Sequence, residues 1–254
     1  MHEKTGIIIQ ARTGSSRLPK KIVLPFYQDN CVLDILLLKL SSVFNSNKIV
    51  VATTTNQSDD LVEGITLRHG CMVFRGDETD VLKRFIDASD FYGYNKIIRI
   101  CADNPFLSIS SVAQLCNEFD SSVADYICYA TSSGIPTIKT HYGFWCEAVK
   151  VEALKKINIM TTEAIYHEHV TNFIYSHRDI FDCKLLKIPC EIENKQNIRM
   201  TLDTIDDFNM LREIYAGIID LGRDPSEIND VVAYLECHTN YYKAMKEQIK
   251  KNKK

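Results

Sequence analysis

The sequence lacks the features that mark membrane, secreted and nucleic-acid-binding proteins. Its first apolar run, residues 6–9, is too short for a signal peptide or a membrane span. No basic stripe dominates, and the formal net charge is −3, which argues against a nucleic-acid partner. No pair among the nine cysteines forms a CxxC motif, so reduced, buried thiols are expected rather than disulfides or a zinc site. These absences predict a cytoplasmic protein with neither a membrane nor a nucleic-acid partner.

The sequence also has no internal repeat, no low-complexity tract and no linker long enough to separate two free domains. Because 45% of the residues are hydrophobic, the chain can build one large core. The strand–helix rhythm changes at the turn-rich stretch 132–136. We therefore expect one domain over residues 1–240 with an inserted arm at about 132–195. The lysines of residues 241–254 are interpreted as a solvated, frayed helix or tail rather than a phosphate-binding segment.

Short apolar runs rich in Ile and Val alternate with helical patterns in the first half of the chain. This alternation favours an α/β fold with a mainly parallel sheet, and the continuous apolar strands indicate that both faces of the sheet are covered. The expected strands are residues 7–9, 48–52, 71–74, 96–101 and 126–129, and the expected helices are 31–44, 59–69, 79–92 and 110–119. Later in the chain, helices are expected over 147–157 and 162–176, strands over 183–188 and 198–202, and a further helix from Asp203 or Thr204.

Residues 10–21, which follow the first strand, combine four cations, a glycine and three hydroxyl side chains. In open α/β sheets ligands bind at the edge where parallel strands end. Gly14 permits a close approach of the backbone to an anion, and Arg12, Arg17 and Lys21 can neutralise a triphosphate. The loop is neither a Walker A motif nor a dinucleotide fingerprint. It is therefore a candidate phosphate-binding loop, and the alternative is an ordinary solvated basic loop.

Two acids stand at the ends of two later strands. Asp103 follows the strand of residues 96–101, and Asp203 follows the expected strand of residues 198–202. Taken singly, Asp103 resembles a turn residue that bonds its own backbone, and Asp203 resembles a helix N-cap. Taken together with the basic loop, they predict a site for Mg²⁺ and a triphosphate, because Mg²⁺ prefers few carboxylates plus phosphate oxygens and water.

Six strings occur in the order and spacing of a known family. They are QARTGSSRLPKK at 10–21, VATTTNQSDD at 51–60, FRGDETDVLKRF at 74–85, RICADNPFL at 99–107, HEHVTNFI at 167–174 and RMTLDTIDDF at 199–208. On these strings the chain resembles the cytidylyltransferases, in particular the spore-coat-polysaccharide F-like branch, whose wider relatives are the CMP-Kdo and CMP-acylneuraminate synthetases. The resemblance covers most of the chain.

The resemblance implies a nucleotide-diphospho-sugar-transferase-like three-layer α/β sandwich, often dimerised through its inserted arm. It implies that Arg12, Arg17, Lys21 and Asp103 are catalytic and that Asp103 and Asp203 bind Mg²⁺. CTP would be held by the first loop and by the loop of residues 75–80. The residues implied for nucleotide binding are Gln10, Ala11, Arg12, Gly14, Ser15, Ser16, Arg17, Lys21, Thr53, Arg75 and Asp80.

The acceptor region departs from the family's pattern, because Tyr142 replaces an acid that often precedes the glycine, whereas Gly143 and Glu147 keep their places. We expect a small anionic or sugar-like acceptor. The alternative is that the side chains of this region only pack the arm, and a zinc site is not expected because HExxH is absent. The expected acceptor-binding residues are Lys139, Tyr142, Glu147, His167 and His169.

A homodimer is expected through the arm, because Tyr142, Phe144 and Trp145 cluster there and aromatic groups are enriched at interface cores. The alternative is that these rings fill the domain core or line the acceptor pocket.

In the expected reaction an acceptor hydroxyl or phosphate attacks the α-phosphorus of CTP in line, and pyrophosphate leaves. One alternative is a glycosyltransferase that uses a nucleotide-sugar donor, although Asp103-Asn104-Pro105 does not supply a DxD metal motif. Another is a catalytically silent nucleotide-binding protein, which the presence of both acids and the full basic loop disfavours.

Overall fold

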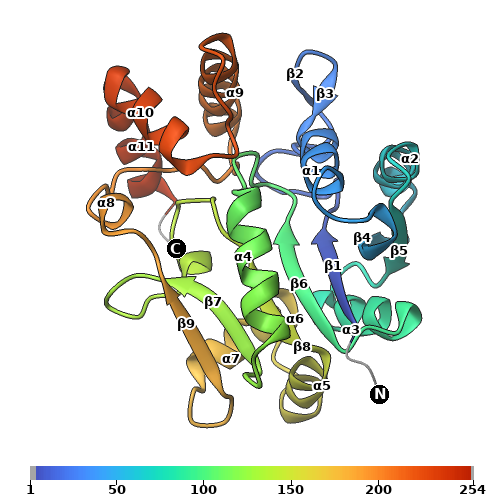
Figure 1. The fold of residues 1–254 in the computed structure, drawn as a ribbon. Helices are drawn as coiled ribbons and strands as arrows, with labels where there is room; N and C mark the ends of the chain where they lie inside the picture. Colours follow the sequence, from blue (N-terminus) through green and yellow to red (C-terminus); the bar gives the residue numbers. More distant parts are fainter. Residues whose placement is uncertain (1–3, 253–254) are drawn as a thin grey trace.

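A seven-stranded sheet forms the centre of the computed structural model, which describes residues 4–252. Its strand order is β5-β4-β1-β6-β8-β7-β9, and β8 runs antiparallel to both of its neighbours while the other pairs are parallel (Figure 1). A separate hairpin of β2 and β3 follows the first loop. The strands are β1 (Thr5–Gln10), β2 (Pro25–Tyr27), β3 (Asn30–Cys31), β4 (Ile49–Thr54), β5 (Met72–Gly76), β6 (Lys96–Cys101), β7 (Tyr126–Ala130), β8 (Glu147–Lys150) and β9 (Cys183–Lys187).

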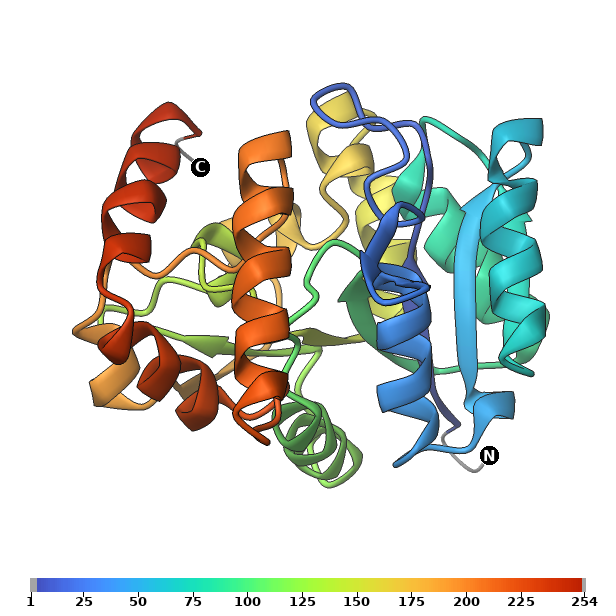
Figure 2. The ribbon, with the colours of Figure 1, turned by 90° about the horizontal axis from the view of Figure 1, so that it is seen from above.

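Helices cover both faces of this sheet, so the molecule has three layers. One core cluster joins the sheet to α1, α4, α9 and α10, and a second joins it to α3, α5 and α7. In Figure 2 the green helix α4 and the yellow helices of residues 151–176 lie on opposite sides of the sheet. The helices are α1 (Val32–Ser41), α2 (Asp60–Arg68), α3 (Val81–Tyr92), α4 (Ile109–Asp120), α5 (Val151–Met160), α6 (Ala164–Glu168), α7 (Asn172–Ser176), α8 (Cys190–Glu193), α9 (Ile205–Asp220), α10 (Ile228–Cys237) and α11 (Asn240–Lys251).

The central strands are apolar on both faces because helices cover both. Every residue of β4 is buried, as are Ile7, Ile8 and Ile9 of β1. Side-chain caps fix where the neighbouring helices begin: Ser108 accepts from the backbone of Ser111 at the start of α4, and Thr204 forms a capping box with Asp207 at the start of α9. The α/β sandwich with a mainly parallel sheet is thus confirmed.

The structure corrects three of the elements expected after residue 132. Residues 147–157 are not one helix, because Glu147–Lys150 is strand β8 and the helix begins at Val151. Residues 162–176 form two short helices rather than one. Residues 198–202 join no strand, although all five are buried. A short apolar run does not by itself distinguish a strand from a helix or a buried extended segment.

The range 132–195, expected to be an inserted arm, supplies β8 and β9 to the central sheet. Its aromatic cluster packs in the core: Tyr142, Phe144 and Trp145 are at most 6% exposed, and the Trp145 ring contacts both of the others edge-on. These rings therefore fill the domain core, which is the alternative to a dimer surface. A dimer through other parts of this range stays a prediction.

The C-terminal residues form a helix, α11, as one of the two expectations had it, but this helix is anchored to the domain rather than frayed. Met245 is fully buried, its sulfur accepts from the backbone of Arg199, and Gln248 donates to Asp206 at 2.8 Å. Residues 253 and 254 of the predicted tail lie outside the described residues. None of the helices over residues 4–252 has both the length and the apolar character needed to cross a bilayer.

Candidate active site

The first loop, residues 11–24, is fixed at its start by a buried aspartate. Asp59 accepts from the backbone N and the Oγ1 of Thr13, at 2.7 and 2.6 Å, and also from Thr54 at the end of β4. Burial would raise the pKa of Asp59, but the hydrogen bonds from Thr13 and Thr54 outweigh it and the pKa is lowered. The ionised carboxylate therefore ties the loop to the sheet edge. The sequence reasoning did not assign this role, although Asp59 lies within the VATTTNQSDD string.

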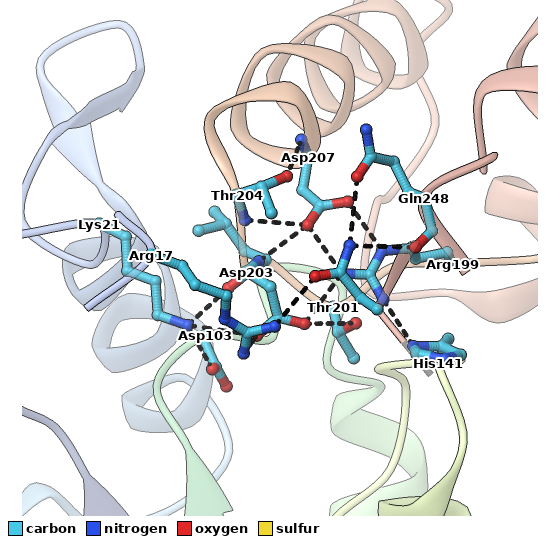
Figure 3. A network of polar contacts seen from close by, with 12 residues as sticks. Arg17, Lys21, Asp103, His141, Arg199, Thr201, Asp203, Thr204, Asp207 and Gln248 are labelled. Carbon is cyan, nitrogen blue, oxygen red and sulfur yellow. Dashed lines mark hydrogen bonds and ion pairs between the residues drawn. The ribbon is translucent and has the colours of Figure 1, made fainter. Parts of the chain in front are cut away.

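Lys21 brings Asp103 and Asp203 together, as Figure 3 shows. Its Nζ lies 2.7 Å from Asp103 Oδ2 and 3.7 Å from Asp203 Oδ1, and it donates to the carbonyl of Leu202 at 2.6 Å. Leu202 in turn donates its backbone N–H to the carbonyl of Asp103 at 3.1 Å. Arg17 adds an ion pair to Asp203 at 2.7 Å. The basic loop and both acids thus form one cluster, as the sequence predicted.

This cluster suits a divalent cation. One ammonium already lies between two carboxylates, so the place between Asp103 and Asp203 has the charge and access that a cation needs. Residues 4–252 contain no group of three or more His, Cys, Asp or Glu side chains that could hold a metal by themselves. A metal here would need phosphate oxygens and water as further ligands. Mg²⁺ sites in proteins commonly have such ligands.

A buried arginine, Arg199, contacts Asp203 on the side that faces the protein interior. The side chain of Arg199 is 0% exposed and donates from Nη2 to Asp203 Oδ2 at 2.9 Å. It also pairs with Asp207, at 2.7 Å from Nε and 2.8 Å from Nη2, and Nη1 contacts His141 Nδ1 at 2.5 Å. Sequence reasoning gives no role to Arg199 or Asp207, and it takes His141 for a cationisable group of the acceptor region. The Thr204-x-x-Asp207 spacing signals the helix cap but not the arginine that shares it.

A cavity of about 550 Å³ opens beside the acids. The first loop and the strand ends form one part of its wall, with Gln10, Arg12, Arg17, Asp103 and Asp203. The segment 137–145 and helices α6 and α7 form another part. The lining residues there include Ile138, Lys139, Thr140, Trp145, Ile165, Glu168, His169, Asn172 and Tyr175. Two predicted acceptor residues, Lys139 and His169, therefore share one cavity with the candidate nucleotide site.

The other three predicted acceptor residues do not line this cavity. Tyr142 is 6% exposed, and its hydroxyl donates to the carbonyl of Glu193 at 3.3 Å. His167 lies between Asp80 Oδ2, at 2.8 Å, and the carbonyl of Thr161, at 3.0 Å. The backbone contact to Thr161, followed by Asp80, raises the pKa of His167. Both side chains are committed to contacts within the chain.

Glu147 is buried beneath a residue that lines the cavity. It is 2% exposed and accepts from Arg99 Nη1 at 2.6 Å, from the hydroxyl of Thr171 and from Tyr126. Arg99 lines the cavity and donates from Nη2 to Gln10 Oε1 at 3.0 Å. Glu147 therefore supports the cavity floor through Arg99 rather than facing a ligand.

Glu147→Gln should accordingly lower stability. Removing one charge of a buried pair leaves Arg99 uncompensated, at a cost of about 3 kcal/mol in the free energy of unfolding. Urea denaturation measures it. Glu118→Gln is the control, because the pair of Glu118 with Lys184 is 37% and 45% exposed and should contribute less than about 1 kcal/mol. Equal, small losses in both variants would contradict a supporting role for Glu147.

The predicted nucleotide residues fall into two groups. Gln10, Arg12 and Arg17 line the cavity. The others do not line it: Ala11 and Thr53 are buried, and Arg75 is bound by Asp60 and Glu63 at 2.7 Å each. The residues that do not line the cavity are Ala11, Gly14, Ser15, Ser16, Lys21, Thr53, Arg75 and Asp80.

The loop of residues 77–80 is nevertheless tied to the first loop. Arg12 Nη1 donates to the carbonyl of Glu78 at 3.2 Å, and the buried Arg84 donates to the carbonyls of Asp77 and Glu78. Asp80 accepts from the backbone of Lys83 and so begins α3. A Cβ at Gly14 would meet only Glu78 Oε1, at 3.8 Å, so the backbone of the first loop is open toward the solvent side. The two loops form one continuous rim.

Two related proteins cover most of the chain. An uncharacterised protein of Methanocaldococcus jannaschii is 37% identical over 207 residues, which are 82% of this chain and 81% of the relative. The spore coat polysaccharide biosynthesis protein SpsF of Bacillus subtilis is 32% identical over 213 residues, which are 82% of this chain and 85% of the relative.

Solved structures share the fold. A cytidylyltransferase from Leptospira borgpetersenii has a TM-score of 0.82 at 24% identity, covering 94% of this chain and 96% of its own. CMP:2-keto-3-deoxy-manno-octonic acid synthetase in complex with CTP has a TM-score of 0.62 at 14% identity, covering 85% of this chain and 99% of its own. Because these two structures are only 24% and 14% identical to this chain, they show a shared fold and nothing further. The model of the cytidylyltransferase family matches residues 6–247, so the chain belongs to that family and is a nucleotidyltransferase.

Proposed function

We propose that the protein transfers CMP from CTP to a small anionic or sugar-like acceptor, with Mg²⁺, and releases pyrophosphate. The observation that carries this proposal is the contact of Lys21 with both Asp103 and Asp203, two acids that line the cavity. Cations of one loop meet two carboxylates, Asp103 after β6 and Asp203 before α9, where a triphosphate and a metal would balance each other's charge.

In this proposal the first loop does most of the work on the nucleotide. Arg12, Arg17 and Lys21 bind the triphosphate and neutralise the charge that builds on the departing pyrophosphate. Arg17 and Lys21 now pair with the carboxylates, and they would exchange these partners for phosphate oxygens. Asp103 and Asp203 would hold Mg²⁺, which supplies further charge neutralisation at the phosphates when bound. The acceptor then attacks the α-phosphorus in line, from the cavity side.

Acceptor binding belongs, in the same proposal, to the part of the cavity opposite the first loop. Lys139 Nζ lies 5.7 Å from the centre of the Tyr175 ring, and His169 faces the same space. A cation and a cationisable ring beside Asn172 and Glu168 suit an acceptor with one carboxylate or phosphate and several hydroxyls. Tyr142 and Glu147 shape this part from within the core.

The pathway that we propose for this reaction follows from the name of a relative. Because SpsF of Bacillus subtilis is a spore coat polysaccharide biosynthesis protein, we place this activity in the synthesis of precursors for a surface polysaccharide or glycoconjugate, in the cytoplasm, where CTP is available. Assembly as a homodimer stays a prediction, and light scattering at micromolar concentration tests it.

Pyrophosphate release tests the proposed reaction. Four nucleoside triphosphates should be screened with Mg²⁺ against acidic sugars, sugar phosphates and polyol phosphates. We expect release with CTP and one class of anionic acceptor. Turnover of a nucleotide sugar without pyrophosphate would identify a glycosyltransferase instead. Tight CTP binding without turnover on any acceptor would identify a silent nucleotide-binding protein.

Lys139→Ala and His169→Ala should reduce acceptor use selectively. Each removes a positive or protonatable group from the acceptor side of the cavity, so kcat/KM for the acceptor should fall roughly 10-fold or more while KM for CTP stays within about twofold. Steady-state kinetics with each substrate varied in turn measures both. Lys187→Ala, an exposed lysine on β9, is the control. Equal losses for both substrates, or a lower melting temperature with unchanged kinetics, would refute an acceptor role.

A further inference from the structure

The two oxygens of Asp203 have different partners. Oδ1 faces the first loop, at 2.7 Å from Arg17 and 3.7 Å from Lys21. Oδ2 faces the interior, at 2.9 Å from Arg199 and 3.5 Å from the hydroxyl of Thr201. The direction in which Oδ1 points is therefore set by what holds Oδ2.

We propose that Arg199 is a positioning residue that couples the acceptor side of the cavity, through His141, to the orientation of Asp203. The proposal rests on the proposed function, in which Asp203 holds the metal and residues near Lys139 hold the acceptor. Arg199 touches neither substrate, because its side chain is 0% exposed, and it acts through the carboxylate and the imidazole that it joins.

One side of Arg199 is rigid. Asp207 receives Nε and Nη2 of the guanidinium and also the backbone N–H groups of Asp203 and Thr204, each at 3.0 Å. The same Asp207 closes the capping box of α9. Burial alone would lower the pKa of Arg199, but Asp207 and Asp203 outweigh burial and raise it. Arg199 is thus a permanent cation held at the start of a long helix.

The other side of Arg199 reaches the cavity wall. His141 lies in the segment 137–143, whose Thr137, Ile138, Lys139, Thr140 and Gly143 line the cavity. Its carbonyl accepts from the backbone of Met200 at 2.9 Å. Gly143 has a φ of 70°, and a Cβ there would come within 2.7 Å of the Met200 carbonyl group, so only glycine allows the two segments to lie this close. A ligand that shifts the segment shifts His141 with it.

The contact between Arg199 and His141 fixes the state of the imidazole. A guanidinium can only donate, so Nδ1 of His141 accepts and the ring proton is on Nε2. If His141 did not accept this hydrogen bond, Nη1 of Arg199 would lose it within the protein interior. The guanidinium would then be free to turn, and Oδ2 of Asp203 would lose its fixed direction.

The test compares His141→Leu with His141→Asn. Leucine removes the acceptor, whereas the asparagine Oδ1 lies close to the place of the imidazole Nδ1, and the backbone contact to Met200 persists in both. Binding of Mn²⁺ in the presence of a non-hydrolysable CTP analogue is measured by electron paramagnetic resonance. His141→Leu should bind Mn²⁺ roughly 10-fold more weakly and lose a similar factor in kcat, with KM for CTP nearly unchanged, and His141→Asn should recover most of both. Nitrogen NMR should find His141 of the wild type protonated on Nε2.

Asp203→Asn separates this proposal from the function on which it rests. If Asp203→Asn loses Mn²⁺ while His141→Leu binds it normally, the coupling is wrong and the metal site stands. If Asp203→Asn also binds Mn²⁺ normally, the metal site and the coupling both fall. Equal defects in the leucine and asparagine variants would show that ring volume matters and not the hydrogen bond, which would overturn the proposal, as would a proton on Nδ1.

Discussion

Asp103→Asn and Asp203→Asn should each reduce kcat by roughly two to three orders of magnitude. Each substitution removes one of the two negative charges that meet at Lys21, and with it one ligand of the proposed Mg²⁺ site. Raising the Mg²⁺ concentration should recover part of the lost rate, because a weakened metal site is filled again by mass action. Pyrophosphate release at several Mg²⁺ concentrations measures both effects. Near-wild-type activity at limiting Mg²⁺ would show that the metal assignment is wrong.

The two variants should differ in stability. Asp103 has a side chain that is 30% exposed and pairs with Lys21, whereas Asp203 is 11% exposed and also compensates the buried Arg199. Asp203→Asn should therefore cost about 1–3 kcal/mol in the free energy of unfolding, and Asp103→Asn much less. Asp220→Asn, an exposed acid at the end of α9, is the control for both kinetics and stability. The control also excludes a general effect of removing one negative charge.

The first half of the fold could be predicted because its signals are local. β1, β4, β6 and β7 are apolar runs buried on both faces, and helices with turn-rich ends separate them. The second half could not, because β8 is a short antiparallel strand inserted between β6 and β7. Its residues continue directly into α5, so a strand of four residues and a helix read as one apolar pattern. Only the pairing of β8 with β6 and β7 distinguishes this strand from the helix that follows it.

In the candidate site, too, the sequence predicts what local signals indicate and misses what depends on distant partners. That Asp103 and Asp203 meet the first loop follows from their places after two apolar segments, even though residues 198–202 form an extended segment and not a strand. The roles of Asp59 and Arg199 depend on partners far along the chain, Thr13 and His141, and no local spacing indicates such pairs. Glu147 was assigned to the ligand because of its residue type, but burial beside Arg99 makes it a support.

The cations of the candidate site pair with its acids. Arg17 and Lys21 neutralise Asp203 and Asp103, and Asn252 at the end of α11 accepts a further hydrogen bond from Arg17 at 3.2 Å. In the proposed function, nucleotide and metal bound together would keep these charges balanced. Arg17 and Lys21 would then pair with phosphate oxygens, and Asp103 and Asp203 would hold the metal.

Replacing Lys21 should separate these two exchanges. In Lys21→Met the triphosphate loses a cation that meets the charge of the departing pyrophosphate, so kcat/KM for CTP should fall roughly 100-fold or more. The carboxylates of Asp103 and Asp203 would then share no ammonium and would repel each other. Mg²⁺ alone should consequently raise the melting temperature of Lys21→Met more than that of the wild type, since the ammonium that contacts both acids no longer competes with the metal.

Lys21→Arg is the matched control for this last prediction. It keeps a positive charge between the carboxylates, so Mg²⁺ without nucleotide should shift its melting temperature as little as it shifts that of the wild type. Thermal denaturation with and without MgCl₂, together with calorimetry of CTP binding, measures both effects. Two results would contradict the account. An equal Mg²⁺ shift in all three proteins would mean that Lys21 and the metal do not compete for one place. A Lys21→Met variant that binds CTP normally and loses only acceptor affinity would remove Lys21 from the triphosphate site.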